Sequence, residues 1–213
     1  MKTLVEIFES HQGRQAHKPV KYLAIYDRHF QRFLGKPVTI LEIGVGQGGS
    51  LQLWKQYFGS EAKVIGIDCE PLCAGMVEDQ IQVCIGPQQD AAFLRDVVEE
   101  LGAPDIVIDD AGHRTVETCA TFKALYPLLP PYGMYVVEDL GTSYWVSYGG
   151  GLHHPESFIE MTKSLIDEMH AAAQGSSPTE FCATTEGIHI YENLFIFEKH
   201  PYVPTIGVLR GGQ

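Results

Sequence analysis

Short apolar runs alternate with amphipathic segments along most of the chain. The apolar runs are rich in valine and isoleucine, and they predict five strands at residues 38–44, 63–68, 81–86, 104–110 and 133–140. Between them, apolar residues recur at helical spacing and predict helices at residues 49–58, 90–102 and 115–129. Continuous apolar strands are typical of sheets covered on both faces, so the pattern predicts a doubly wound α/β fold around a mostly parallel sheet.

The pattern changes toward the end of the sequence. We expect a helix at about residues 155–173, and residues 188–199 contain two apolar stretches on either side of Glu192-Asn193. Such a pair indicates a hairpin or a bent strand pair with an antiparallel member. We therefore expect a seven-stranded sheet with an antiparallel C-terminal strand. No repeat, low-complexity tract or linker is found, so we expect one domain over residues 1–213.

Glycines after the first predicted strand form the first candidate binding site. Gly44, Gly46 and Gly49 match the G-x-G-x-x-G spacing of dinucleotide-binding loops, where glycine allows a tight turn and close approach of the backbone to a ligand. Asp68 ends the next predicted strand, where a carboxylate can hold ribose hydroxyls. The loop alone therefore does not separate NAD from S-adenosylmethionine (SAM).

Two features of this loop favour SAM. Glu42 precedes the glycines, and a carboxylate there suits the cationic methionine part of SAM but would repel a pyrophosphate. Gly48 and Ser50 extend the turn, which indicates a roomy loop rather than a tight cradle at a helix start. A glycine turn without a ligand remains the alternative.

Acidic residues close the fourth and fifth predicted strands. Because the carboxyl ends of parallel strands meet at one edge, and neighbouring strands lie roughly 4.8 Å apart, we expect Asp110, Glu138 and Asp139 to converge. Three close carboxylates repel one another, so one of them stays protonated or a cation neutralises them. Oxygen ligands favour Mg²⁺ over Mn²⁺ or Ca²⁺. We expect Asp109, on the opposite side of its strand, to face the cofactor.

His113 follows Asp110 on the same loop and is a candidate general base. A histidine with an ordinary pKa of about 6.5 can accept a proton at neutral pH. We predict that it deprotonates a substrate hydroxyl held by the metal, so that the oxygen attacks the SAM methyl group. The alternatives stay open: the acid pair caps the next helix, and His113 is an ordinary loop residue.

Aromatic and histidine residues follow the fifth predicted strand. Tyr144 and Trp145 belong either to the core or to a lid that faces the substrate. His153 and His154 follow three glycines, and we interpret them as a solvated loop or a pair in a substrate loop.

Two motifs, DIVIDDAGH at residues 105–113 and GMYVVEDLGTSYW at residues 133–145, closely resemble those of the metal-dependent sugar O-methyltransferases of macrolide and other polyketide pathways. The mycinamicin and rhamnosyl 2′-O-methyltransferases are the nearest types, and the cephalosporin methyltransferase/hydroxylase group shares parts of the pattern. The resemblance extends over about residues 15–200. It implies a class I methyltransferase fold, with an N-terminal helical segment, about residues 1–35, near the pocket.

The resemblance also implies roles for single residues. Asp110, Glu138 and Asp139 would bind Mg²⁺ or Mn²⁺, His113 would be the base, and Asp68 would hold the SAM ribose.

Two further positions concern the segment after the third predicted strand. Gln88 matches the family pattern and would line the adenine pocket, whereas Pro87 stands where the family has an acid, so the role of that acid is open. Some members carry an extra N-terminal domain that this sequence does not show, so the acceptor need not be a macrolide sugar.

The charge composition limits which classes of partner the chain can bind. The chain has 15 Lys and Arg against 27 Asp and Glu, a net charge of −12, which argues against nucleic acid and against an anionic membrane surface. No apolar run is long enough to span a membrane, and the N-terminus lacks a signal-peptide core, so we expect a cytoplasmic protein. The five scattered cysteines have no C-x-x-C spacing, and we interpret them as buried thiols.

These observations predict a SAM-dependent, Mg²⁺-assisted O-methyltransferase. Its acceptor would be a hydroxyl of a small natural product, a sugar or vicinal diol, as in antibiotic biosynthesis, and the family suggests a homo-oligomer. Two other hypotheses remain: an NAD-dependent oxidoreductase and a SAM-binding subunit without catalytic activity.

Overall fold

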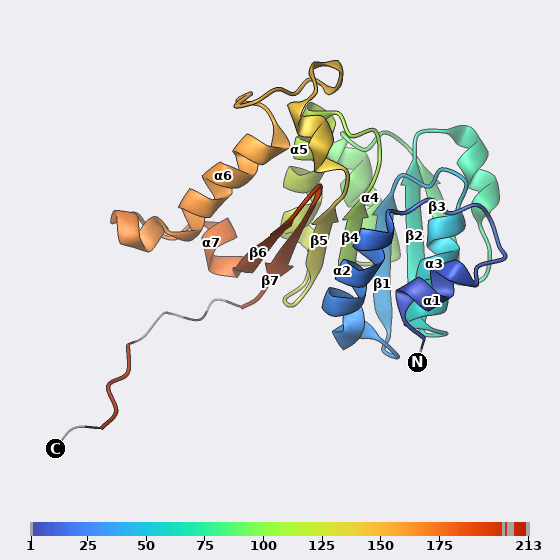
Figure 1. Ribbon diagram of the computed structural model, residues 1–213, viewed down its shortest axis with the longest axis horizontal. Helices are drawn as coiled ribbons and strands as arrows, with labels where there is room; N and C mark the ends of the chain where they lie inside the picture. Colours follow the sequence, from blue (N-terminus) through green and yellow to red (C-terminus); the bar gives the residue numbers. More distant parts are fainter. Residues whose placement is uncertain (1, 202, 204–206, 212–213) are drawn as a thin grey trace.

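Seven strands form one sheet in the computed structural model, which describes residues 2–201, 203 and 207–211 (Figure 1). The strand order is β3-β2-β1-β4-β5-β7-β6. The strands are β1 (Val38–Ile43), β2 (Ala62–Asp68), β3 (Ile81–Ile85), β4 (Ile106–Asp109), β5 (Met134–Val137), β6 (Thr185–Tyr191) and β7 (Leu194–Lys199). Strands β1 to β5 are parallel, and β7 is antiparallel to both β5 and β6. This arrangement confirms the predicted fold class.

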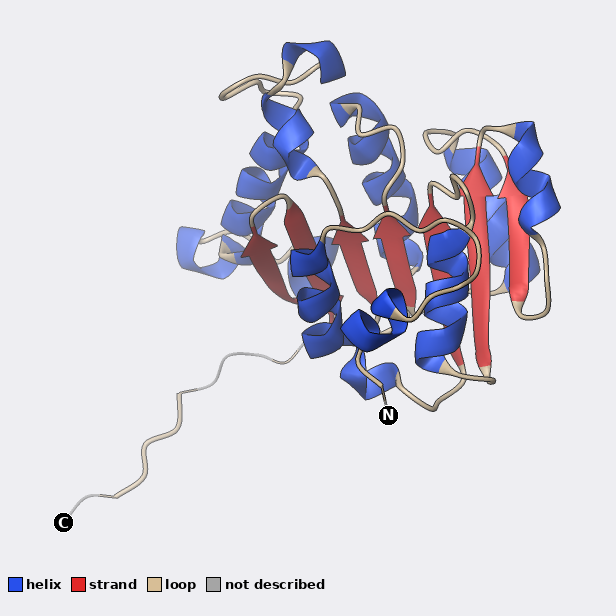
Figure 2. Cartoon of the chain, turned by 45° about the vertical axis from the view of Figure 1, so that its right-hand side comes forward, coloured by secondary structure: helices blue, strands red, loops and turns tan. Residues whose placement is uncertain are grey.

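Helices cover both faces of the sheet (Figure 2). One face packs against α1 (Leu4–Glu9), α2 (Val20–Phe30) and α3 (Gly49–Phe58). The other packs against α4 (Ala91–Leu101), α5 (Thr115–Leu125) and α6 (Phe158–Met169), with the short α7 (Glu180–Thr184) near its edge. Ile40 and Leu41, neighbours on β1, are both fully buried on opposite faces. The uninterrupted apolar pattern of the strands is therefore explained by cover on both sides.

Two predicted strands are shorter in the structure. Strand β4 spans 106–109 rather than 104–110, and β5 spans 134–137 rather than 133–140. Asp139 has φ +52°, which an extended strand cannot contain, and a 3₁₀ helix, Leu140–Tyr144, follows it. The backbone thus turns away from the sheet where the candidate acids lie.

Two predicted helices are divided. The segment 115–129 consists of α5 and a 3₁₀ turn that contains Pro127, which cannot donate a backbone hydrogen bond. In place of one helix at 155–173, the structure has α6, which begins at Phe158, and a 3₁₀ turn, Ala171–Gln174, with His170 between them.

The cysteines only partly match their predicted burial. All five are free, but Cys73 and Cys119 are buried whereas Cys69 is exposed. Among the described residues, no helix combines the length and hydropathy that a membrane span requires.

Candidate functional site

A cleft of about 600 Å³ lies at the carboxyl edge of the sheet, beside the end of β1. The loops after β1, β3 and β4, the end of β2 and residues 15–18 before α2 form its walls. Open α/β sheets bind their ligands at this edge. Seven of the residues predicted from the sequence line the cleft: Gly44, Gly46, Gly49, Ser50, Asp68, Gln88 and Asp110.

The glycines after β1 allow close packing at one point and leave open space at another. Gly44 has φ +97°, and a Cβ atom there would lie 2.1 Å from the carbonyl oxygen of Asp110. Gly46 has φ +52°, and a Cβ atom there would meet nothing within 4 Å. The backbone at Gly46 therefore forms a cradle that a side chain would fill.

The helix after this loop starts where the sequence suggested a roomy turn. Gly48 has φ +77° and is the N-cap of α3, whose first residue is Gly49. A Cβ atom on Gly49 would lie 2.4 Å from the carbonyl oxygen of Arg14 and 2.3 Å from that of Gln15. The prediction of a roomy loop is wrong, because the N-terminal segment packs tightly against the helix start.

Asp68 connects the end of β2 to the glycine loop. Its Oδ2 accepts hydrogen bonds from the backbone N–H groups of Val45 at 2.9 Å and Gly46 at 3.2 Å, and its Oδ1 accepts one from Glu70 at 2.9 Å. Burial alone would raise the pKa of Asp68, but these backbone donors hold it below its ordinary value. The cleft therefore has an ionised carboxylate in its wall.

Gln88 and Pro87 both line the cleft after β3. The Gln88 amide accepts from the Gly112 N–H at 3.2 Å and donates to the Thr121 hydroxyl at 3.2 Å. These bonds tie the loop after β3 to the loop after β4 and to α5. Asp90, in the same segment, caps α4 through the backbone of its first turn.

Lys18 lies among three carboxylates at the floor of the site. Its Nζ is 2.5 Å from Asp110 Oδ2 and 2.6 Å from Glu138 Oε1. It also lies 3.2 Å from Glu42 Oε1, and the Tyr26 hydroxyl donates to the same Glu138 oxygen. The Lys18 side chain is 1% exposed. One ammonium thus serves three acids, which leaves the group with excess negative charge when all are ionised.

Burial and ion pairing have opposite effects on the pKa values of Glu138, Glu42 and Lys18. Burial raises the pKa of Glu138 above its ordinary value, although the Lys18 ammonium lowers it. Burial also raises the pKa of Glu42 above its ordinary value. It would lower the pKa of Lys18, but the three carboxylates raise that value well above normal. Lys18 is not among the residues predicted from the sequence, and no local motif marks it.

His113 stands between two of the predicted acids. Its Nε2 lies 3.9 Å from Asp110 Oδ1 and 3.6 Å from Asp139 Oδ2, and ligand atoms of the three residues lie within 4.8 Å of one another. Tyr22 of α2 donates to the other oxygen of Asp139 at 3.0 Å. His113 and Asp139 have φ +53° and +52°. Such backbone is uncommon outside glycine and concentrates at functional sites.

The three predicted metal ligands therefore do not all meet at one point. Asp110 and Asp139 meet beside His113, whereas Asp110 and Glu138 meet at the Lys18 ammonium. Glu138 is 3% exposed, while the side chains of Asp110 and Asp139 are 22% and 44% exposed. The open pair of acids is Asp110 and Asp139.

The placement expected for Asp109 is wrong. It is absent from the cleft lining, 2% exposed, and its Oδ2 accepts a hydrogen bond from the Tyr135 hydroxyl at 3.0 Å. Val107, two residues earlier on β4, packs in the core beneath α4 and α5, and alternation along a strand puts Asp109 on that same face. Burial raises the pKa of Asp109 to about 7.

Glu42 acts from beneath the cleft rather than inside it. It is fully buried, and its Oε2 accepts a hydrogen bond from the Ser50 hydroxyl at 2.6 Å. Its Oε1 has no hydrogen-bond partner among the described residues, although Lys18 is close enough for an ion pair. Glu42 therefore supports Ser50 and Lys18, which both line the cleft.

Tyr144 and Trp145 are not core residues. They are 48% and 56% exposed, and the Trp145 ring packs against Tyr148 with centroids 5.7 Å apart. Their role as a substrate lid stays a prediction. In the nearby glycine-rich loop, the His153 side chain is 74% exposed and its Nδ1 lies 3.4 Å from Glu160.

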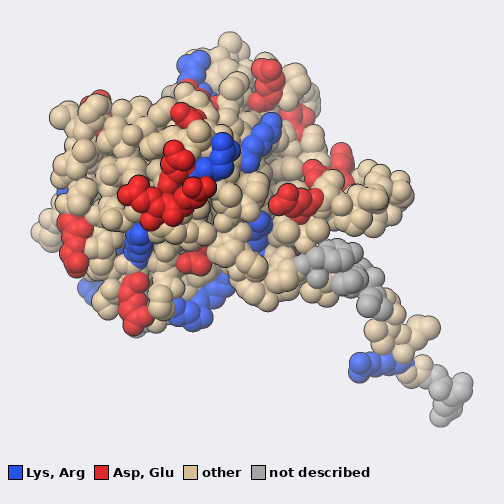
Figure 3. Space-filling view, turned by 180° about the vertical axis from the view of Figure 1, so that it is seen from behind, with Lys and Arg blue, Asp and Glu red and all other residues tan. Residues whose placement is uncertain are grey.

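Acidic side chains are prominent on the surface, as the net charge of −12 leads one to expect. Acidic side chains gather on the face opposite the view of Figure 1, and lysine and arginine side chains form separate groups around them (Figure 3). A continuous basic stripe of the kind that tracks a nucleic acid backbone is not seen on this face.

No protein-family model matches the chain. Among curated proteins, the 8-demethyl-8-(2-methoxy-α-L-rhamnosyl)-tetracenomycin-C 3′-O-methyltransferase of Streptomyces olivaceus is 37% identical over 192 residues, which are 84% of this chain and 49% of that protein. The mycinamicin VI 2″-O-methyltransferase of Micromonospora griseorubida is 35% identical over 188 residues, 82% of this chain and 47% of that protein. The chain thus spans about half the length of the curated relatives it matches.

Solved structures give a similar result. The MycE methyltransferase from the mycinamycin biosynthetic pathway, in complex with Mg, SAH and mycinamycin VI, has a TM-score of 0.86 at 32% identity, over 96% of this chain and 56% of that one. A putative caffeoyl-CoA O-methyltransferase from Staphylococcus aureus has a TM-score of 0.56 at 12% identity, over 94% of this chain and 93% of that one. The second likeness concerns the fold alone.

Proposed function

The chain is a homologue of the sugar O-methyltransferases of macrolide and tetracenomycin pathways, and from this premise we propose that it transfers a methyl group from SAM to a hydroxyl of a small sugar or vicinal diol. The observation that carries the proposal is the group of Asp110, Asp139 and His113, of which Asp110 lines the glycine-loop cleft. Each part of the site supports one requirement of the reaction.

The cleft fits the cofactor. The open cradle at Gly46 gives a ligand direct access to the backbone, and the ionised Asp68 in the same wall suits ribose hydroxyls. Glu42 supplies negative charge beneath Ser50 and Lys18, so its support for the cationic sulfonium is indirect. We propose that Gly44, Gly48 and Gln88 shape the cleft without a charged contact to SAM.

The open acids fit a hard divalent ion. Mg²⁺ binds through one or two carboxylates and keeps several waters, and Asp110 and Asp139 present partly exposed oxygens on either side of His113. When bound, Mg²⁺ would hold the acceptor hydroxyl and make it more acidic. We assign Asp110 and Asp139 as the direct ligands, and we propose that Glu138 contributes mainly by fixing Lys18 and Tyr26.

His113 is then the proton acceptor. In the proposed step the acceptor hydroxyl gives its proton to His113 Nε2, a C–O bond forms to the methyl carbon, and the C–S bond breaks to leave S-adenosylhomocysteine (SAH). His113 Nε2 lies 3.9 Å from Asp110 Oδ1 and 3.6 Å from Asp139 Oδ2, so the base stands beside the two proposed ligands. Lys18 holds Asp110 by its other oxygen, which fixes the loop that carries the base.

A transfer assay tests the proposal. Methyl α-L-rhamnopyranoside serves as a simple vicinal-diol acceptor, and SAH release is measured with Mg²⁺ and with EDTA. We expect EDTA to abolish turnover and His113→Ala to lower it by about 10²–10⁴-fold, with SAM binding retained. His153→Ala is the matched control, because this exposed histidine also lies beside a carboxylate.

Binding measurements separate the alternatives. Stabilisation against heat by SAM but not by NAD supports the proposal, and the reverse would support an oxidoreductase. Turnover unaffected by EDTA would remove the metal from the reaction. Binding of SAM without transfer to any polyol would support a non-catalytic subunit.

We further propose that residues 1–213 act as one domain in a cytoplasmic homo-oligomer. The continuous sheet and the packing of α1 and α2 against it support one domain. Light scattering on the purified chain tests the oligomeric state.

A further inference from the structure

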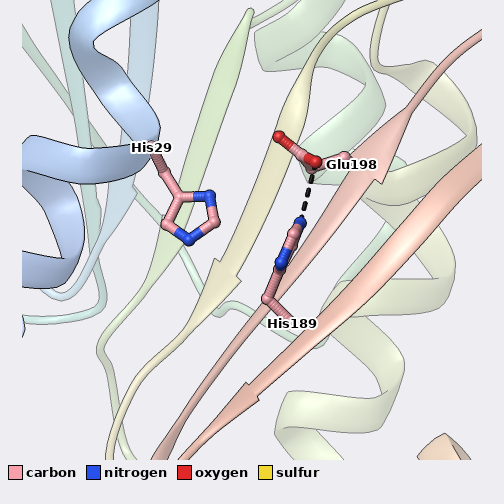
Figure 4. A group of neighbouring side chains, drawn as sticks. All are labelled: His29, His189 and Glu198. Atoms are coloured by element: carbon pink, nitrogen blue, oxygen red, sulfur yellow. Dashed lines mark hydrogen bonds and ion pairs between the residues drawn. The ribbon is translucent and has the colours of Figure 1, made fainter.

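A second cluster of metal-binding side chains lies outside the cleft. It consists of His29 from α2, His189 from β6 and Glu198 from β7 (Figure 4). One ligand atom from each residue lies within 4.8 Å of the other two, and all three side chains are half-buried. We propose that this cluster, here called the His₂Glu cluster, is a binding site for a borderline divalent ion of the Zn²⁺ type.

The sheet positions two of the ligands. Glu198 pairs with Gly187, two residues before His189, so the two side chains are diagonal neighbours on one face of the hairpin. His189 Nε2 lies 2.8 Å from Glu198 Oε2. Two ligands at about 2.0–2.1 Å from a tetrahedral zinc are about 3.3 Å apart, so an ion can replace the shared proton with a small outward movement.

The third ligand comes from the end of α2. The ring of His29 faces the pair, with centroids of the two imidazoles 4.5 Å apart (Figure 4). Its Nε2 lies 2.8 Å from the Tyr191 hydroxyl, which leaves Nδ1 for coordination. A hydrogen bond to the second ring nitrogen is the usual way in which proteins orient a histidine ligand.

The charges around the cluster match this ion class. Arg32 pairs with the other oxygen of Glu198 at 3.1 Å and leaves Oε2 to the histidines. Two imidazoles and one carboxylate suit Zn²⁺ or Co²⁺ better than Mg²⁺, which prefers oxygen. A water would complete the tetrahedron.

An ion at this site would join α2 to the C-terminal hairpin. His29 follows Tyr22 and Tyr26 on one side of α2, at spacings that share a helix face, and those tyrosines donate to Asp139 and Glu138. The ion would thus hold in place the helix that supports the acids of the cleft. The proposal does not depend on the proposed reaction.

Metal titration of the whole chain tests the site without SAM or acceptor. The titration uses Co²⁺ as a spectroscopic probe for zinc, in excess Mg²⁺ so that the Asp110–Asp139 site is occupied by its preferred ion. We expect one equivalent to bind with the absorption of a four-coordinate nitrogen and oxygen site. Zn²⁺ at a hundredfold excess over its Kd should raise the Tm by about 5–10 °C.

Three variants decide the outcome. His29→Gln and His189→Gln should each weaken Co²⁺ binding at least tenfold and abolish the Tm increase. His153→Gln, which removes an exposed histidine beside Glu160, should change neither. Co²⁺ binding that survives both cluster variants, or a thiolate charge-transfer band from a cysteine, would overturn the proposal. Circular dichroism verifies that each variant is folded.

Discussion

Replacement of Lys18 by methionine removes the ammonium that Glu42, Asp110 and Glu138 share. Methionine keeps an apolar stem of similar length, so the change removes charge with little loss of packing. The Glu42 and Glu138 side chains are 0% and 1% exposed, so water cannot replace the lost partner. Loss of one member of a buried ion pair costs about 3–5 kcal/mol, and we expect Lys18→Met to lose that much unfolding free energy.

Urea unfolding, followed by tryptophan fluorescence in EDTA, measures this loss. Trp54 is fully buried and its ring centroid lies 5.9 Å from Lys18 Nζ, so the signal reports on this part of the core. Lys21→Met is the matched control, because Lys21 and its partner Glu192 are 56% and 74% exposed. Water screens such an exposed pair, so Lys21→Met should leave the stability nearly unchanged.

A double variant separates charge from packing. In Lys18→Met/Glu138→Gln the neutral amide no longer needs the ammonium, and it can still accept a hydrogen bond from Tyr26. We expect the double variant to recover part of the lost stability, because removal of both partners costs less than removal of one. If Lys18→Met loses less than about 1 kcal/mol, or if the double variant is less stable than the single one, the ammonium does not hold these acids together.

Two further predictions concern the loop and the buried acid. Gly44→Ala should weaken SAM binding at least tenfold in calorimetry, because its Cβ atom would overlap the Asp110 carbonyl. Gly59→Ala is the control: Gly59 has φ +95°, but a Cβ atom there meets nothing within 4 Å. This variant therefore carries backbone strain alone and should bind SAM normally. Asp109 has a pKa of about 7 in the folded chain, above its ordinary value. Between about pH 4 and pH 7 the folded chain therefore binds this proton more tightly than the unfolded chain does. The free energy of unfolding should fall as the pH rises through this range. Urea unfolding across this range should show that Asp109→Asn loses this part of the pH dependence, and an unchanged slope would contradict the assignment.

The fold was predictable because its signals are local. Valine and isoleucine runs mark strands buried on both faces, and glycines or acids mark their ends. Strands β4 and β5 were both predicted too long. After β5, the left-handed backbone of Asp139 ends the extended segment, and aspartate adopts that backbone too rarely for the sequence to mark the turn. Local patterns set the element type, and the tertiary site sets where each element stops.

The site was predictable only to the level of the sheet edge. Strand ends brought Asp110 and Asp139 together, but the direction of each side chain depends on turns beyond the strands. Asp109 could have been placed correctly, since alternation with Val107 already assigns it to the other face. Lys18 could not, because it meets Glu138 across 120 residues of sequence.

The segment that precedes and forms α2 gives the acidic edge its partners. A parallel sheet places its strand-end carboxylates at one edge, where they repel one another unless another element brings donors or cations. Lys18 supplies the cation, and Tyr22 and Tyr26, four residues apart on the same helix face, supply donors to Asp139 and Glu138. These contacts occupy one oxygen each of Glu138, Asp110 and Asp139, and the Glu138 side chain is 1% exposed. The remaining oxygen of each aspartate points toward His113. The N-terminal segment therefore determines which carboxylate oxygens stay available for a metal. Helix α2 is itself held against the hairpin of β6 and β7, where His29 Nε2 lies 2.8 Å from the Tyr191 hydroxyl.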